Sequence, residues 1–207
     1  FKDGCELPVH EAQFKVDALL PSGEAYPEYD RLTEDGVIEL GIIFGAAESV
    51  PYGGDWGVMM WRTYATNLRL AGYTEEIREV GRLYTREKGG LTESIELYSP
   101  YDLHDLGTDS VSDLLVQLLL SKEIIAYNGH SFYGSLDVLN DRNNYPEERY
   151  QILFMDSCWS YEYYTKQVFE NKATEADPSG WLNADVVNNT QPAYFTNMEG
   201  STRKLVT

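Results

Sequence analysis

Cysteine and histidine are scarce in this chain, whose 207 residues include two cysteines and three histidines. Two cysteines cannot form the multiple-disulfide framework of a small secreted domain, although a single bridge between Cys5 and Cys158 is possible. They also lack the Cys-x-x-Cys spacing of a zinc site, so we predict no metal and no other cofactor. A Cys5–Cys158 bridge would exclude any role of Cys158 as a nucleophile.

Basic residues are also few. The sequence has 16 Lys and Arg against 34 Asp and Glu, which gives a formal net charge of −18. This negative field repels phosphate backbones and anionic membrane surfaces, so we do not expect nucleic acid as a partner. It would favour cationic substrates, although an acidic surface more often serves only solubility.

Long apolar runs are absent, because none approaches the roughly 18 residues that cross a bilayer, and no membrane span is predicted. The chain starts at Phe1 with neither Met nor a signal peptide, so we expect this start to be an end left by processing or truncation. The many tyrosines and asparagines slightly favour a secreted or periplasmic bacterial protein over a cytoplasmic one and leave the compartment unknown.

The length and the 43% hydrophobic content are sufficient for one sizeable core. We expect this core within residues 36–207, which we predict to form one α/β domain. Residues 1–35 contain scattered prolines and follow neither the helical nor the strand period. We interpret them as an irregular arm packed on the domain, a linker or a pro-segment.

Apolar runs and caps alternate along the domain. The run at residues 37–44 predicts a central parallel strand, and Asp55 is the expected N-cap of a helix that Gly72 stops. Further helices are expected at residues 110–121 and 159–171, and strands at 94–98, 123–129, 151–157 and 184–188, with weak strand character at 77–80. The alternation predicts a doubly wound, mostly parallel sheet with helices on both faces.

Two side chains that can act as a base and a nucleophile directly follow predicted buried strands. They are His130 and Cys158. Because parallel strands end at the same edge of a sheet, we expect the imidazole and the thiol to lie side by side there. A thiol needs a nearby base or a helix N-terminus to become a nucleophile, and Cys158 has both in prospect. The N–H groups of Ser131 and Cys158 are candidates for an oxyanion hole. Each side chain alone is more often structural, but their shared position favours catalysis.

The segments that carry these residues, Ile124-Ile-Ala-Tyr-Asn-Gly-His130 and Ile152-Leu-Phe-Met-Asp-Ser-Cys158, resemble the caspase-like cysteine peptidases. This group includes caspases, metacaspases, legumain and gingipains, and the motifs are nearest to those of metacaspases. Ser160 also matches a serine that is common two places after the family's cysteine. The resemblance extends over residues 36–195 in the order of elements, but in motif it covers only these segments.

The resemblance implies a caspase-like fold and an endopeptidase that cleaves through a thioester, with Cys158 as nucleophile and His130 as general base. It also implies that Asp156 lines the pocket for the residue before the cut, which would then be Arg or Lys. Asp55 is the nearest match to a second substrate-binding acid, although it could equally be only a helix cap. The substrates would be proteins or peptides. No acidic calcium loop is recognisable, so calcium dependence is not implied.

Two alternatives stay open. Ser131 stands where the family has glycine, which restricts the backbone and favours a catalytically inactive member that serves as a binding module. The other alternative is a latent zymogen, activated by cleavage of the amino-terminal arm or of a segment near Lys172 or Arg86.

Overall fold

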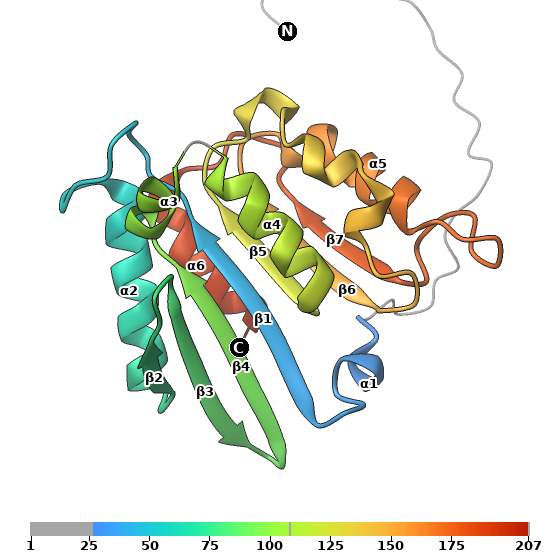
Figure 1. Cartoon of the computed structure of the whole chain (residues 1–207), viewed down its shortest axis with the longest axis horizontal. Helices are drawn as coiled ribbons and strands as arrows, with labels where there is room; N and C mark the ends of the chain where they lie inside the picture. The colour runs from blue at the N-terminus through green and yellow to red at the C-terminus, as the bar shows by residue number, and fades with distance from the viewer. Residues whose placement is uncertain (1–26, 108, 207) are drawn as a thin grey trace, which may run out of the picture.

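The computed structural model describes residues 27–107 and 109–206, which form a mixed α/β domain around a seven-stranded sheet (Figure 1). Cys5 and most of the expected arm lie outside the described residues. The strands are β1 (Val37–Phe44), β2 (Thr74–Ile77), β3 (Arg82–Lys88), β4 (Leu91–Tyr98), β5 (Ile124–Asn128), β6 (Gln151–Asp156) and β7 (Ala184–Asn188). Their order in the sheet is β2-β3-β4-β1-β5-β6-β7. Strands β4, β1, β5, β6 and β7 are parallel, and β2 and β3 add an antiparallel edge.

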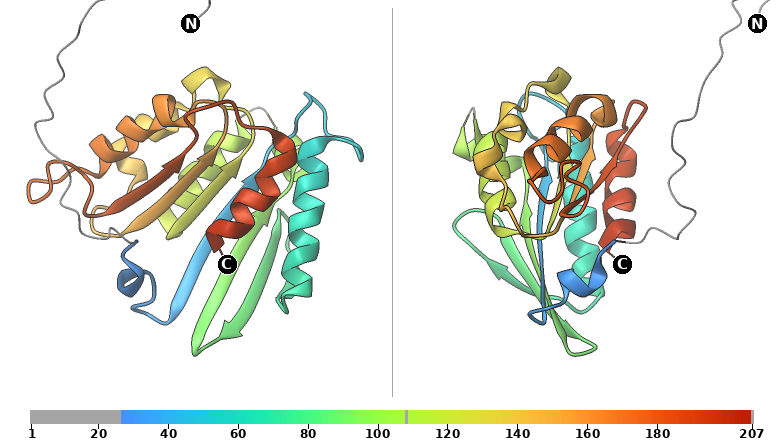
Figure 2. Two further views of the ribbon diagram at one scale, coloured as in Figure 1. Left: turned by 180° about the vertical axis from the view of Figure 1, so that it is seen from behind. Right: turned by 90° about the vertical axis from the view of Figure 1, so that its right-hand side faces the viewer.

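Helices cover both faces of this sheet. They are α1 (Tyr29–Leu32), α2 (Trp56–Leu70), α3 (Pro100–Leu106), α4 (Ser110–Ser121), α5 (Ser160–Lys172) and α6 (Phe195–Val206), with short 3-10 helices η1 (Phe132–Gly134), η2 (Asp137–Asn140) and η3 (Arg142–Asn144). Helices α2 and α6 pack side by side on one face, while α4 and α5 lie on the other (Figures 1 and 2). The predicted α/β architecture, with a mostly parallel sheet, is confirmed at this level.

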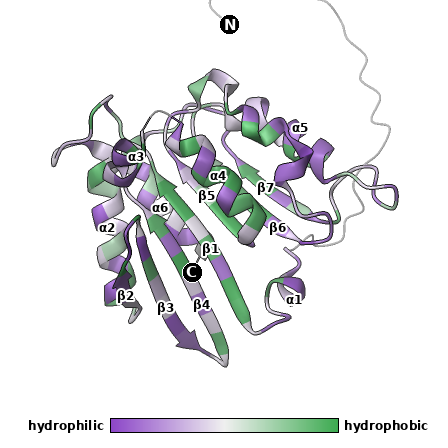
Figure 3. Cartoon of the chain, viewed as in Figure 1, coloured by the Kyte–Doolittle hydropathy of each residue, from purple (hydrophilic) through white to green (hydrophobic). Residues whose placement is uncertain are grey.

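Successive apolar side chains of the central strands point to opposite faces of the sheet, so both faces need a covering layer of helices. In β1, Leu40 and Ile42 face the core under α2 and α6, whereas Ile43 faces the core under α4 and α5. Strands β5 and β6 are buried along their whole length, and Figure 3 shows the apolar stretches of the inner strands. A strand buried on both faces reads as a continuous apolar run, which is the pattern that the sequence carries.

The described elements differ from the sequence expectations around the edge of the sheet. The weak strand predicted at residues 77–80 is wrong, because two strands, β2 and β3, lie on either side of a turn that ends at Gly81, with φ +72°. The expected strand at 94–98 begins earlier, at Leu91. Helix α3 was not predicted, although Ser99 and Asp102 form a capping box at its start. Helix α1 lies within the expected irregular arm.

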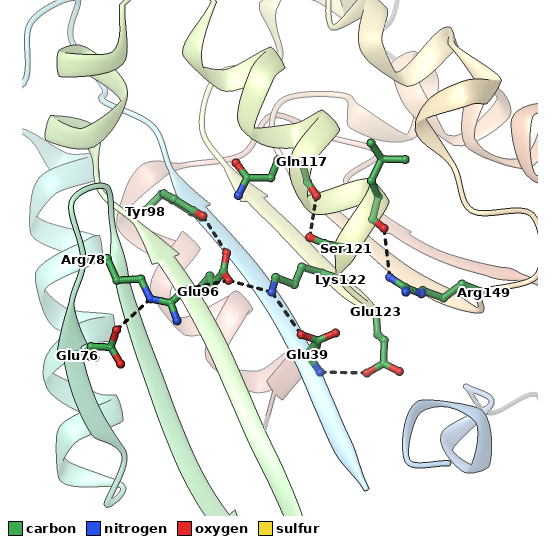
Figure 4. Close-up of polar contacts among 11 residues, drawn as sticks. Glu39, Glu76, Arg78, Glu96, Tyr98, Gln117, Ser121, Lys122, Glu123 and Arg149 are labelled. Carbon is green, nitrogen blue, oxygen red and sulfur yellow. Dashed lines mark hydrogen bonds and ion pairs between the residues drawn. The ribbon is translucent and has the colours of Figure 1, made fainter. Parts of the chain in front are cut away.

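A polar cluster stabilises the sheet face beside the end of α4 (Figure 4). The Nζ of Lys122, a residue only 7% exposed, lies 3.0 Å from a carboxylate oxygen of Glu96 and 3.5 Å from one of Glu39. Burial alone would raise the pKa of Glu96, but the hydrogen bonds from Lys122 and Tyr98 hold it below its usual value. The pairing allows a lysine to be buried against the side chains of strands β1 and β4.

The strand order gives the sheet one switch point. From β1 the chain crosses to β4 on one side, whereas β5 pairs with β1 on the other, so the switch point lies between β1 and β5. In sheets of this kind ligands bind beyond the carboxyl ends of the strands near that point. His130 follows β5 and Cys158 follows β6, and both strands end there. Among the described helices, none is long and apolar enough to cross a membrane.

Candidate active site

His130 and Cys158 line the same cavity at this edge. The cavity has a volume of about 550 Å³, and its wall is completed by residues of η1 and the start of α5: Ser131, Phe132, Tyr133, Ser135 and Trp159. His130 is exposed and Cys158 is half-buried, so both side chains are accessible from the cavity. The structure thus brings together the two residues that the strand ends had indicated.

The imidazole of His130 is held by the loop after β1. Its Nε2 lies 3.0 Å from the carbonyl oxygen of Ala47, and its ring meets Phe195 edge-on at 5.1 Å between centroids. A carbonyl oxygen only accepts hydrogen bonds, so Nε2 must carry the proton. In a neutral ring the other nitrogen, Nδ1, then has a free lone pair that can accept a proton.

Asp55 holds that loop in place. It is 1% exposed, and its carboxylate accepts hydrogen bonds from the N–H groups of Ala47 at 3.0 Å, Glu48 at 2.9 Å and Val58 at 3.1 Å. The last of these bonds caps α2, so the expected N-cap role is confirmed. The predicted contact of Asp55 with a substrate has no support in this geometry, because the carboxylate is enclosed by the backbone of the loop and the helix.

Cys158 lies in a tight turn between β6 and α5. Its thiol lies 3.7 Å from the carbonyl oxygen of Ala193, to which it can donate a hydrogen bond. Helix α5 begins only at Ser160, with Trp159 as N-cap in the left-handed region at φ 49°. The N–H groups of Trp159 and Tyr161 donate to carbonyl oxygens in the loop after β7. Cys158 therefore precedes the helix instead of opening it, and that loop occupies part of the helix N-terminus.

Two backbone N–H groups, those of the expected oxyanion hole, have no acceptor among the described residues. Within the described residues, the backbone N–H groups of Ser131 and Cys158 donate no hydrogen bond to the protein. Ser131 has φ −77° and ψ −8°, a conformation that any residue adopts, so serine causes no strain in place of the family's glycine. The left-handed conformations follow at Phe132 and Tyr133 instead.

Asp156 lies on the other face of the sheet from the cavity. Its neighbours Ile152 and Phe154 alternate onto the face under α6, and Asp156 continues that series. It is 5% exposed, and its Oδ1 accepts a hydrogen bond of 2.6 Å from the side chain of Asn189. Burial raises its pKa, and the side chains of Asn189 and Ser201 oppose this rise. The predicted pocket acid is thus covered: Oδ1 is paired with Asn189, and Oδ2 is buried without a hydrogen-bond partner among the described residues.

A second cavity adjoins the first at His130 and Phe132. It has a volume of about 610 Å³ and is bounded by the loop after β1, by α3 and by the start of α4; its lining includes the exposed Glu48 and His104.

The two expected cleavage points lie within regular elements. Lys172 is 2% exposed at the end of α5, and Arg86 lies inside β3.

The sequence did not predict the groups that surround His130 and Cys158. Ala47 contributes only a backbone carbonyl, which leaves no signature in a side-chain pattern. The exposed aromatics Phe132, Tyr133 and Trp159 lie next to the two motifs, and their clustering there could have indicated the site.

A search of protein-family models finds none that matches this chain, and a search of curated proteins finds no match either.

Proposed function

We propose that this chain is a cysteine endopeptidase of the caspase-like type, in which Cys158 is the nucleophile and His130 the general base. The observation that carries the proposal is the shared cavity, which both side chains line at the carboxyl edge of a parallel sheet. Thiol, imidazole and two free N–H groups are the parts that acyl transfer requires.

The chemistry follows from these positions. Nδ1 of His130 accepts the thiol proton while Nε2–H stays bonded to Ala47, and the sulfur attacks the carbonyl carbon of the substrate. The N–H groups of Ser131 and Cys158 stabilise the negative oxygen of the tetrahedral intermediate. His130 then protonates the leaving amine as the C–N bond breaks, which leaves a thioester on Cys158. Water, deprotonated by His130, hydrolyses the thioester and restores the thiol.

We further propose that the residue before the cut is Arg or Lys, bound by Asp156. The support is its place two residues before Cys158 and the net charge of −18, which favours cationic substrates. Asn189 occupies only Oδ1, and the buried Oδ2 has no hydrogen-bond partner among the described residues, so a guanidinium or ammonium group can bind once the cover over the carboxylate opens. A bidentate Arg contact, with charge on both partners, is stronger than the single hydrogen bond from the neutral Asn189 amide.

A latent form of the same enzyme is the second candidate, and a specific observation favours it. The carbonyl oxygen of Ala193 accepts a hydrogen bond from the Cys158 thiol, and Phe195 packs on the ring of His130. One short segment after β7 therefore contacts both members of the dyad. Activation would require this segment to move, which differs from the expected cut near Lys172 or Arg86.

Turnover of short fluorogenic peptides tests the proposal. In reducing buffer, peptides with Arg or Lys before the cut should be cleaved and matched peptides with Asp should not, and Cys158→Ala should abolish cleavage. Absence of cleavage for every peptide, or activity that survives in Cys158→Ala, would contradict the proposed function. Cleavage after Asp would contradict only the assignment of Asp156.

A further inference from the structure

The 550 Å³ cavity beside Cys158 presents three large aromatic side chains to solvent. Phe132 is 43% exposed, Tyr133 88% and Trp159 42%. Single exposed apolar residues are normal on a protein surface, but a group of aromatics around one concavity marks a binding site. Packing among residues 27–107 and 109–206 does not explain this arrangement, since these rings leave much of their surface uncovered there.

The backbone supports the same interpretation. Phe132, Tyr133 and Trp159 are the non-glycine residues with positive φ in the described part of the chain, at 48°, 52° and 49°. Bulky residues rarely adopt this conformation, which costs on the order of 1 kcal/mol or more for each residue. Strain of this kind gathers at binding sites, where the surrounding structure holds it. Here the carbonyl of Ser131 accepts from Tyr164 Oη and Gly134 N–H, and Trp159 N–H donates to Gln191.

The cavity is also free of acidic residues and of Lys and Arg. The chain has 34 acidic residues, yet none of the seven residues that line this cavity is acidic, and none is Lys or Arg. The neighbouring 610 Å³ cavity, by contrast, includes Glu48. A charged side chain would lose hydration in the aromatic cavity without gaining a partner, whereas an apolar ring would be buried favourably.

The positions of Asp156 and the aromatic cavity on opposite faces of the sheet determine which substrate residue can lie in the cavity. Asp156 lies on the α6 face, and the aromatic cavity lies on the face of η1 and α5, with Cys158 at the edge between them. A peptide that places the residue before the cut at Asp156 therefore directs the residue after the cut toward η1. We propose that the aromatic cavity is a subsite for a bulky apolar side chain, preferentially aromatic, of the residue that follows the cut. This inference rests on the proposed function for its placement relative to Cys158.

Peptide binding to the Cys158→Ala variant tests the subsite without turnover. Two peptides are compared that differ only in having Phe or Gly after a central Arg, and their dissociation constants are measured by calorimetry. We expect the Phe peptide to bind about tenfold more tightly or better, as the burial of one aromatic ring implies. Adding Phe132→Gly or Trp159→Gly, which removes a ring and fits the left-handed backbone, should remove most of this preference.

Trp181→Ala is the matched control, because Trp181 is 57% exposed, packs against Phe169 and does not line the cavity. Its removal should leave the Phe preference unchanged. Equal binding of both peptides, no binding of either, or a preference that survives both glycine variants would overturn the inference. The wild-type enzyme separates the two proposals: equal cleavage of both peptides refutes the subsite alone. Cleavage of neither, with a Phe preference retained in Cys158→Ala, refutes the proposed peptidase and supports the subsite as a peptide-binding pocket.

Discussion

Replacement of Asp55 by alanine should destabilise the protein more than the loss of an ordinary helix cap. Loss of an N-cap costs about 1 kcal/mol, and the bond to Val58 supplies that part. The N–H groups of Ala47 and Glu48 lose the same charged acceptor, and hydrogen bonds to charged groups contribute roughly 1.5–3 kcal/mol each. Because the loop is only half-buried, water replaces part of this contribution, and we expect a total of about 3 kcal/mol.

Urea unfolding followed by tryptophan fluorescence measures this loss, and Ser99→Ala provides the comparison. Ser99 caps α3 through Asp102 and holds no loop of the site, so its removal should cost about 1 kcal/mol. An Asp55→Ala variant that loses no more stability than Ser99→Ala would refute the view that Asp55 clamps the loop after β1.

The same substitution should also disturb the site, because the clamp positions the carbonyl that holds His130. With Ala47 released, the imidazole loses a fixed partner for Nε2–H. We expect kcat for peptide cleavage to fall more than KM rises in Asp55→Ala, measured where the variant is fully folded. An unchanged kcat would show that the Ala47 contact does not orient the base.

Three further predictions concern the rest of the domain. Burial lowers the pKa of Lys172 to about 7. Its buried charge therefore destabilises the fold at low pH, and this destabilisation decreases as the pH rises from 7 toward the ordinary pKa of lysine. The free energy of unfolding of the wild type, relative to Lys172→Met, should therefore increase between pH 7 and 10 by on the order of a few kcal/mol, and parallel curves would refute this. Burial raises the pKa of Asp156, so ionisation destabilises the fold as the pH rises through that value, and Asp156→Asn should stabilise the protein more at pH 8 than at pH 3 in thermal unfolding. Gly57→Ala would place a Cβ 1.9 Å from the carbonyl oxygen of Gly45 and should cost about 2 kcal/mol or more, whereas Gly200→Ala in α6, with open space around it, should be neutral or stabilising.

The central strands could be predicted from the sequence because they are buried on both faces and their apolar runs are uninterrupted. β1 and β7 lie where the pattern placed them, and α2 follows its cap at Asp55. Helix α4 follows its apolar spacing, but Ser110 is its first residue and not its cap, and the N-cap Asp109 makes no side-chain capping bond. The edge strand β2 could not be predicted, because its four residues are mostly exposed and polar and take their conformation from pairing with β3. Edge strands lack the alternation that burial imposes.

The candidate site likewise has a part that the sequence pattern predicts and a part that depends on tertiary contacts. His130 and Cys158 could be identified because strand ends and topology place them, and these are properties of the sequence pattern. The partner of His130 is a backbone carbonyl, and the loop that covers Cys158 comes from beyond β7, so both depend on tertiary contacts. The covered position of Asp156 follows from strand alternation combined with the packing of α6, and the helix contact could not be read from the motif.

Covalent labelling tests most directly whether Cys158 and His130 act together. The wild-type protein and a folded His130→Ala variant are incubated with a peptidyl acyloxymethyl ketone that ends in Arg, and the adduct is located by mass spectrometry. We expect a single adduct on Cys158 in the wild type, formed at least about a hundredfold more slowly in His130→Ala. Equal labelling rates in the two proteins, or no adduct on Cys158 in the wild type, would contradict the dyad.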